Sequence, residues 1–168
     1  RLVERYGPQN WWPADTPIEV MVGAVLTQAS SWTNVEQALA NLRDADALSS
    51  QAIRDMPLPE LARLVYPSGY YNAKARKLKA LCKFLHDFCE DDIDRMAFRP
   101  TQELRIELLG VYGIGNETAY YILLYALGHP SNVVDTFTRR LMRRIGVVDE
   151  RVNYPRLQAL FMDSLPSD

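Results

Sequence analysis

A glycine-rich loop followed by a carboxylate is the stretch of this chain best suited to chemistry. Three of the eight glycines fall within GVYGIGNETA, residues 110–119, and Glu117 follows the last of them. Gly113 and Gly115 bracket Ile114 just before an apolar run, which leaves backbone N–H groups bare at a helix N-terminus. Such a terminus binds anions, and one phosphate of a nucleic-acid strand fits it. The alternative is a glycine-rich turn between two helices that binds no ligand.

A second carboxylate, Asp135, stands before a helical segment with the sequence TFTRRLMRR. Aspartate at that position caps a helix by accepting a backbone hydrogen bond. A carboxylate can also stabilise a developing positive charge, or orient and deprotonate an attacking water. The two roles are compatible, so Asp135 is a candidate for both.

Composition places the chain among ordinary globular proteins, but its charges are unevenly distributed. It has 168 residues, 48% of them apolar, with a net charge of −2, enough for one large or two small domains. The longest apolar run, YYILLYAL, is too short to span a membrane. All the lysines lie within residues 74–83, and four arginines lie within residues 139–144. Each basic cluster alone is typical of a solvated helix face, whereas two on a near-neutral chain favour an anionic partner.

Helical periodicity dominates the chain, and no alternating strand pattern is evident. Capping-box patterns begin at Thr16 and Thr33, the first with proline at the next position. The longest predicted helix covers residues 72–90, with apolar residues at i, i+3, i+4 and i+7. The sequence therefore predicts an all-α fold of nine or ten helices with short connections.

Four segments resemble the endonuclease III superfamily of DNA glycosylases, in the same order as in that family. LLGVYGIGNETA resembles its helix-hairpin-helix, and VVDTFTRRLMRRIG resembles the segment that carries its aspartate. VMVGAVLTQAS and SGYYNAKARKL resemble two further segments. The resemblance implies a two-domain helical fold, with DNA bound across the cleft between the domains and the target nucleotide flipped out.

The resemblance also implies a domain organisation. Residues 1–15 belong to a terminal domain, residues 16–128 form a six-helix core with the hairpin at 108–119, and residues 129–168 return to the terminal domain. Because the chain starts at Arg1 without Met and ends abruptly, we expect a trimmed fragment whose terminal domain is truncated.

The resemblance places Asp135 at the catalytic aspartate, which stabilises the oxocarbenium-like sugar formed as the N-glycosidic bond breaks. The chain departs from the family at Glu117, where members that also cut the strand carry a lysine that forms a Schiff base. Glutamate cannot do so, and no lysine follows Lys83. We therefore expect a glycosylase that uses water and has no lyase activity. Glu117 either lines the base pocket or is a first-turn acid favoured by the helix dipole.

Trp11 and Trp12 lie in NWWPADTP, directly before the first core helix. Core packing is one role for them, and a stacking wall for a flipped base is the other. An electron-rich indole attracts a cationic ring, such as an alkylated purine. With Glu117, this WWP segment resembles the 3-methyladenine DNA glycosylase branch. The alternatives are a glycosylase for a pyrimidine lesion or a thymine or uracil mismatch, and a helix-hairpin-helix module that binds DNA without catalysis.

Further DNA-binding residues follow from the resemblance. Gln28 fills the gap left by the flipped nucleotide and Tyr70 wedges into the base stack; otherwise Gln28 is a helix-end polar residue and Tyr70 a packed aromatic. Carbonyls of Leu109, Val111 and Ile114 are candidates for a monovalent cation. The other expected DNA contacts are Lys74, Lys77, Gly113, Ile114, Gly115, Thr118, Arg139 and Arg143.

The cysteines give no sign of a cofactor. Cys82 and Cys89 are two helical turns apart, about 10 Å, too far for a disulfide. Many relatives hold a four-cysteine iron–sulfur cluster near their C-terminus, which these two residues do not match. We expect no cofactor within these residues, and a cluster beyond residue 168 is left open. The expected partner is double-stranded DNA with a damaged base, bound by a monomer in the reducing cytoplasm, associated with the nucleoid and not with a membrane.

Overall fold

The computed structural model describes residues 2–7, 12–149 and 151–164, and every regular element in these ranges is helical. The predicted all-α fold is confirmed. In chain order the elements are α1 (Leu2–Tyr6), α2 (Pro17–Leu26), α3 (Trp32–Asp44), α4 (Ser50–Asp55), α5 (Leu58–Leu64), the 3-10 turn η1 (Tyr66–Ser68), α6 (Tyr71–Cys89), α7 (Ile93–Ala97), α8 (Thr101–Gly110), α9 (Asn116–Tyr121), the π-helical turn η2 (Ile122–Ala126), α10 (Thr136–Arg144) and α11 (Tyr154–Met162).

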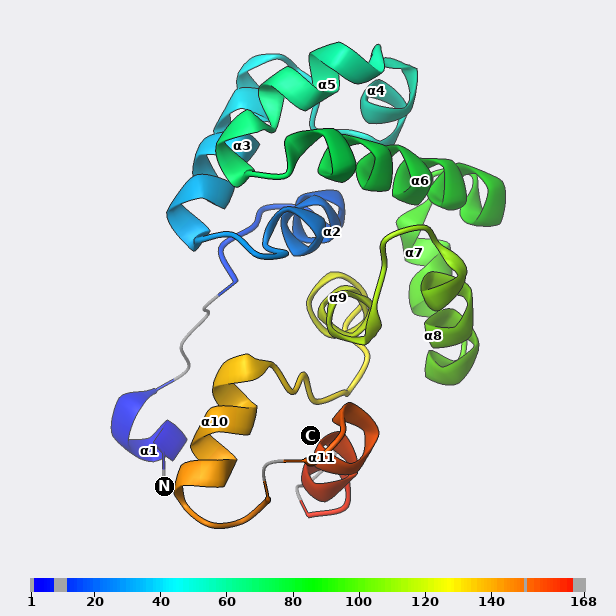
Figure 1. Cartoon of the computed structure of the whole chain (residues 1–168). Coiled ribbons are helices and arrows are strands. Elements are labelled where there is room, and N and C mark those ends of the chain that lie inside the picture. Colours follow the sequence, from blue (N-terminus) through cyan, green and yellow to red (C-terminus); the bar gives the residue numbers. More distant parts are fainter. Residues whose placement is uncertain (1, 8–11, 150, 165–168) are drawn as a thin grey trace.

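The helices form a larger and a smaller unit (Figure 1). Helices α2 to α9 make up the larger unit, and α10 and α11 lie below it, with α1 beside α10. The larger unit has an extensive buried core, whereas the smaller one is built on three buried residues, Val134, Val152 and Leu157. Residues 16–128, for which the family resemblance predicts a six-helix core, contain the eight helices α2 to α9, among them the short α4, of six residues, and α7, of five.

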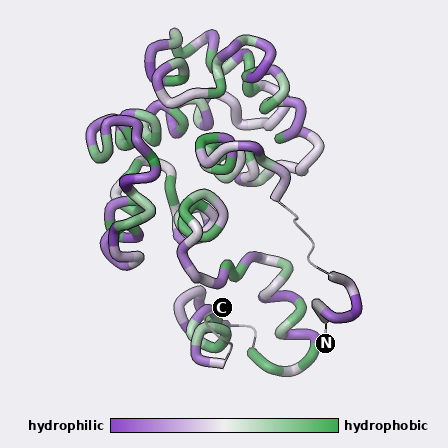
Figure 2. The backbone as a smooth tube through the Cα atoms, turned by 180° about the vertical axis from the view of Figure 1, so that it is seen from behind, coloured by the Kyte–Doolittle hydropathy of each residue, from purple (hydrophilic) through white to green (hydrophobic). Residues whose placement is uncertain are grey.

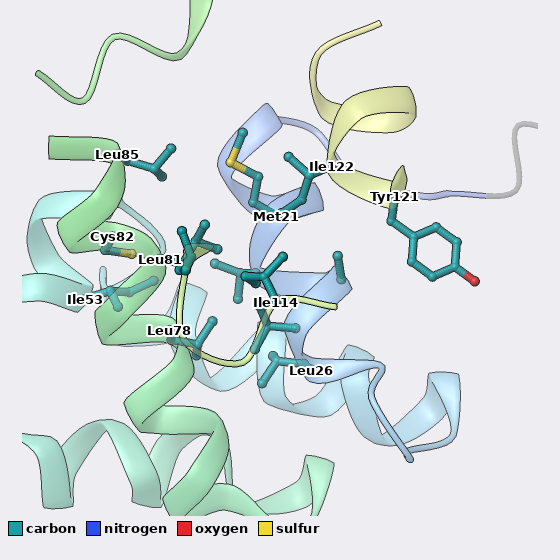
Figure 3. Close-up of a cluster of buried hydrophobic side chains, with 14 of the residues drawn as sticks. Met21, Leu26, Ile53, Leu78, Leu81, Cys82, Leu85, Ile114, Tyr121 and Ile122 are labelled. Carbon is teal, nitrogen blue, oxygen red and sulfur yellow. The ribbon is translucent and has the colours of Figure 1, made fainter. Parts of the chain in front are cut away.

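Helix α2 is the centre of the larger unit. Its residues from Glu19 to Leu26 are all buried, as expected of a helix covered on every side. Apolar segments of α2 and α9 lie in the middle of the molecule (Figure 2). Met21 and Leu26 of α2 converge with Leu78 and Ile114 in the core (Figure 3). No helix in the described ranges is long and apolar enough to cross a membrane.

The two predicted capping boxes have different outcomes. Thr16 caps α2 as expected, because its Oγ1 accepts a hydrogen bond from the Glu19 backbone N–H at 3.3 Å. The cap predicted at Thr33 is wrong: α3 begins at Trp32, with Ser31 as its N-cap and no side-chain capping bond. Trp32 packs against the core, so apolar burial extends the helix past the capping pattern.

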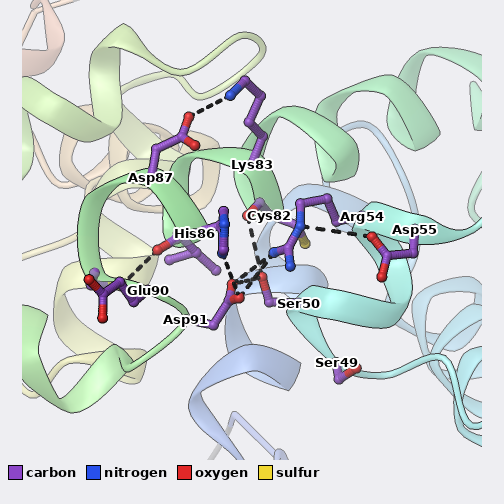
Figure 4. Close-up of polar contacts among 12 residues, drawn as sticks. Ser49, Ser50, Arg54, Asp55, Cys82, Lys83, His86, Asp87, Glu90 and Asp91 are labelled. Atoms are coloured by element: carbon purple, nitrogen blue, oxygen red, sulfur yellow. Dashed lines mark hydrogen bonds and ion pairs between the residues drawn. The ribbon is translucent and has the colours of Figure 1, made fainter.

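Asp91 joins the end of α6 to α4 (Figure 4). It follows α6 with a left-handed backbone, φ 66°. Its carboxylate accepts hydrogen bonds from Ser50 Oγ at 2.7 Å, Arg54 Nη1 at 3.0 Å and His86 Nδ1 at 3.1 Å. Burial opposes ionisation of Asp91, but these hydrogen bonds and the Arg54 charge outweigh it and lower its pKa.

We expect Asp91→Asn to lower the free energy of unfolding by about 1–3 kcal/mol, because Arg54 loses its anionic partner and an NH2 donor replaces one of the two accepting oxygens. A carboxyl group whose pKa is lowered by folding stabilises the protein above its unfolded-state pKa, and this stabilisation is lost as pH falls through the folded-state pKa. Urea unfolding between pH 3 and 7 should therefore be steeper in pH for the wild type than for the variant. Asp55→Asn is the matched control, since Asp55 is exposed and lies 4.0 Å from the same Arg54. Equal losses in both variants would contradict the role of Asp91.

Candidate active site and nucleic-acid interface

Three segments far apart in the sequence enclose a pocket of about 310 Å³. The end of α2 forms one wall of the pocket, the first turns of α9 form the second, and the start of α10 forms the third. The lining residues are Ala24, Thr27, Gln28, Ala29, Glu117, Thr118, Tyr121 and Thr136. The pocket therefore brings the predicted Gln28, Glu117 and Thr118 together beside Asp135, the neighbour of Thr136.

Asp135 is the N-cap of α10, as its sequence position predicts. Its Oδ1 accepts hydrogen bonds from the Thr138 backbone N–H at 2.7 Å and from Thr138 Oγ1 at 2.8 Å. Both bonds use the same oxygen, and Oδ2 has no hydrogen bond to any described residue. One oxygen thus fixes the orientation of the carboxylate, and the other is available for chemistry.

Glu117 lies in the first turn of α9, and Asp135 and Arg139 act on its carboxyl group. Partial desolvation, followed by the negative charge of Asp135, raises the pKa of Glu117. A hydrogen bond from Tyr121 and the charge of Arg139 act in the opposite direction. Since the shift is upward, Glu117 takes up a proton at a higher pH than an ordinary glutamate, although the residue itself is exposed.

Trp12 lies behind the pocket wall. Its ring is stacked on Tyr125 with centroids 5.3 Å apart, and it contacts Tyr121 at 5.0 Å and Trp32 at 5.5 Å. Tyr121 lines the pocket and Trp12 does not. The core-packing role therefore fits Trp12, which supports the aromatic wall from behind. Trp11 lies outside the described residues.

Tyr121 is the pocket residue that sequence reasoning missed. It is buried, hydrogen-bonded to Glu117, and the aromatic residue of the described lining. Its position four residues after Glu117 was the available signal, since that spacing places two side chains on one helix face.

Gln28 connects three elements at the mouth of the pocket. Its Nε2 donates to the Gly113 carbonyl and to Thr118 Oγ1, both at 3.0 Å. Its Oε1 accepts a hydrogen bond from Lys77 Nζ. The end of α2, the hairpin and α6 are thereby held together by one amide group.

The glycine hairpin connects α8 to α9, with Ile114 buried in the core and Tyr112 exposed. Gly113 has a φ of 84°, and the Ile114 N–H donates to the Val111 carbonyl at 3.1 Å. A Cβ atom on Gly113 would lie 2.3 Å from Cγ of Lys77. Gly113 is thus required twice, for its backbone conformation and for the approach of Lys77. Cation binding by the hairpin carbonyls stays a prediction.

We expect Gly113→Ala to destabilise the fold by at least about 1–2 kcal/mol through its left-handed backbone, and to displace Lys77 as well. Gly128→Ala is the matched control, because Gly128 also has a positive φ, 69°, but no atom lies near its added Cβ. Urea unfolding should show a loss in both variants and a larger loss for Gly113→Ala. Weaker binding of duplex DNA should appear for Gly113→Ala alone. Equal behaviour of the two variants would contradict the importance of the Lys77 contact.

The lysine cluster is largely occupied by internal contacts. Lys74 is 1% exposed, and its Nζ donates to the carbonyls of Leu26 and Ser68. Lys79 donates to carbonyls at the end of α4, and Lys83 pairs with Asp87. The predicted phosphate contact of Lys74 is therefore incompatible with its place in this structure, because a charge count along the sequence does not show which ammonium groups bind helix-end carbonyls.

The other predicted DNA-binding residues divide between the pocket and the surface. Arg139 is half-buried and its charge acts on Glu117, although it does not line the pocket, whereas Arg143 is exposed in the last turn of α10. Tyr70 is 74% exposed and has a φ of 46°, at the N-cap of α6. It is therefore not a packed aromatic, and its exposure agrees with the predicted wedge.

The described residues contain no group of three or more His, Cys, Asp or Glu side chains that could hold a metal ion. Cys82 and Cys89 are both buried as free thiols on α6. Two thiols inside the core do not fit the four cysteine ligands of an iron–sulfur cluster.

Comparison with known proteins agrees with this geometry. The family model of the HhH-GPD superfamily base excision DNA repair proteins matches residues 22–167. A Methanocaldococcus jannaschii protein named "Putative DNA repair glycosylase" is 44% identical over 99% of this chain and 76% of its own length. Endonuclease III of Thermotoga maritima is 28% identical over 99% of this chain and 73% of its own length.

Among solved structures, the H. pylori 3-methyladenine DNA glycosylase bound to 1,N6-ethenoadenine superimposes with a TM-score of 0.80. It is 32% identical, and the match covers 96% of this chain and 75% of that protein. A trapped covalent complex of endonuclease III with DNA has a TM-score of 0.79 at 24% identity, over 92% of this chain and 68% of that one, and shares the fold.

Proposed function

The chain belongs to the HhH-GPD superfamily of base excision repair DNA glycosylases, and from that premise we propose that it is a monofunctional glycosylase for alkylated purines. The damaged nucleotide would leave the base stack and enter the pocket beside Asp135. The enzyme would then hydrolyse the N-glycosidic bond and leave an abasic site in an intact strand.

The observation that carries the proposal is the pair of carboxylates at a pocket whose described lining contains no amine. Glu117 stands on the first turn of α9, and one oxygen of Asp135 has no hydrogen bond to a described residue. As the bond between the sugar carbon and the base nitrogen breaks, Asp135 stabilises the positive charge on the sugar. Water adds to that carbon and gives up a proton to the Asp135 carboxylate, and the electrons of the broken bond remain with the departing base.

The negative charge of the pocket favours a positively charged base as the substrate. Two carboxylates and the Tyr121 ring, which is backed by Trp12 and Tyr125, attract a positively charged purine more strongly than a neutral one. An alkylated purine such as 3-methyladenine carries this charge and needs little acid catalysis to leave. The similarity to the H. pylori 3-methyladenine DNA glycosylase supports the same class.

A panel of duplexes tests this function. Each duplex carries one lesion: 3-methyladenine, 7-methylguanine, 1,N6-ethenoadenine, thymine glycol, or a thymine or uracil mismatched with guanine. Released bases are quantified by chromatography, with Asp135→Asn as the blank. We expect release of the alkylated purines. Preferential release of a pyrimidine would replace the proposed substrate class, and binding without release of any base would indicate a non-catalytic module.

A further inference from the structure

The buried ammonium of Lys74 joins two loops that are more than forty residues apart in the sequence. Its Nζ donates to the Leu26 carbonyl at 2.7 Å and to the Ser68 carbonyl at 2.6 Å. Leu26 is the last residue of α2, and Ser68 is the last residue of η1. Gln28 and Tyr70 each follow two residues after one of these carbonyls.

Both loops adopt left-handed backbone conformations next to these residues. Ala29 has a φ of 51°, Gly69 of 69° and Tyr70 itself of 46°. Such conformations are costly for residues other than glycine and persist only where the surroundings fix them. Lys74 fixes the Leu26 carbonyl, three residues before Ala29, and the Ser68 carbonyl, directly before Gly69.

The burial of this charge has a cost that a purely structural residue would avoid. No described carboxylate forms an ion pair with Lys74, and its hydrogen-bond partners are the two carbonyls. Burial, and then the charge of Lys77, lower the pKa of Lys74 to about 8. An apolar side chain of similar length would fill the same space without desolvating a charge. This cost would be offset if Lys74 holds the backbones of the two loops in fixed positions.

We propose that Lys74 is a positioning residue that couples the Gln28 loop to the Tyr70 turn, so that the two loops engage the DNA duplex as one unit. The inference rests on the proposed function, in which the damaged nucleotide leaves the base stack, and on the predicted insertion of Gln28 and Tyr70 beside it. It adds that the two insertions are energetically linked and that Lys74 provides the link.

A double-mutant cycle measures this link. Gln28→Ala, Tyr70→Ala and the double variant are compared for affinity to a duplex with an abasic-site analogue, first in the wild type and then with Lys74→Met. We expect the effects in the wild-type background to deviate from additivity by at least about threefold. With Lys74→Met the two effects should become additive. Lys79→Met is the matched control, because Lys79 binds carbonyls at the end of α4 and touches neither loop.

Amide hydrogen exchange provides a readout that needs no DNA. Lys74→Met should speed exchange about tenfold or more at residues 27–30 and 66–71 together, and Lys79→Met should leave both loops unchanged.

The outcomes separate this proposal from the proposed function. Additive effects in the wild-type background, or coupling that survives Lys74→Met, would overturn the role of Lys74 and leave the glycosylase function intact. If neither single alanine variant weakens binding, insertion itself fails, and the coupling proposal falls with it. If Lys74→Met does not fold, additive effects in the wild-type background would still overturn the proposal.

Discussion

Replacing Asp135 with asparagine is expected to slow base release by at least about 100-fold while folding and DNA binding are kept. The amide oxygen can accept the two hydrogen bonds from Thr138 that now end on Oδ1, so the cap of α10 is preserved. The group lost is the negative charge on Oδ2, which has no partner among the described residues and is free to face the sugar. Single-turnover release of an alkylated purine, at saturating enzyme, measures the effect directly.

Two matched variants separate chemistry from capping at this position. Asn153→Asp makes the reverse exchange at the N-cap of α11, where Asn153 accepts from the Arg156 N–H at 3.0 Å, and it should leave the rate unchanged. Thr138→Ala removes one hydrogen bond to Asp135 but keeps the carboxylate, so its effect should be far smaller than that of Asp135→Asn. A near-normal rate for Asp135→Asn would remove this residue from the mechanism.

Borohydride should trap no covalent complex between the wild-type protein and lesion-bearing DNA. Trapping requires an amine that attacks the sugar and forms a Schiff base, and the family resemblance places Glu117 at the position where members that cut the strand carry this amine. Product strands should break only after alkali or heat. Glu117→Lys, at the same position on α9, is expected to introduce a weak trapped band. Glu107→Lys adds the same amine on the exposed face of α8 and should give none.

One lysine needs its own control in that experiment. Lys77 donates to Gln28, a pocket residue, so its ammonium is the one described amine in contact with the pocket lining. If the wild type gives a strong band, Lys77→Met identifies whether this amine is responsible. Any strong wild-type band would end the monofunctional interpretation.

The sequence was sufficient to predict the class of the fold and several local features. Thr16 and Asp135 each cap a helix as predicted, because a capping side chain needs only its own neighbours along the chain. Ile114 is buried as predicted, because it is the apolar side chain between the two glycines of the hairpin and therefore the one that can pack against the core.

The sequence could not show which partners the long polar side chains bind. Lys74, Lys77 and Lys79 form one basic cluster along the chain, yet each binds an oxygen acceptor of the protein itself. Those acceptors come from the ends of helices that meet only after folding. The spacing from Glu117 places Tyr121 on the same helix face, but the burial of Tyr121 depends also on Trp12, which approaches from a separate segment.

The small core under α10 has a consequence for how the protein loses activity on warming. Helix α10 has no buried residue of its own, and the unit beneath it is built on Val134, Val152 and Leu157. Regions with few buried contacts open at a lower free energy than the rest of a protein. Asp135 belongs to this weakly held unit, whereas the hairpin, Gln28 and Tyr70 belong to the large one. Heat should therefore first produce a species in which the small unit has opened and Asp135 has left the pocket. This species should still bind DNA at the lesion but should not release the base, and it should recover activity on cooling.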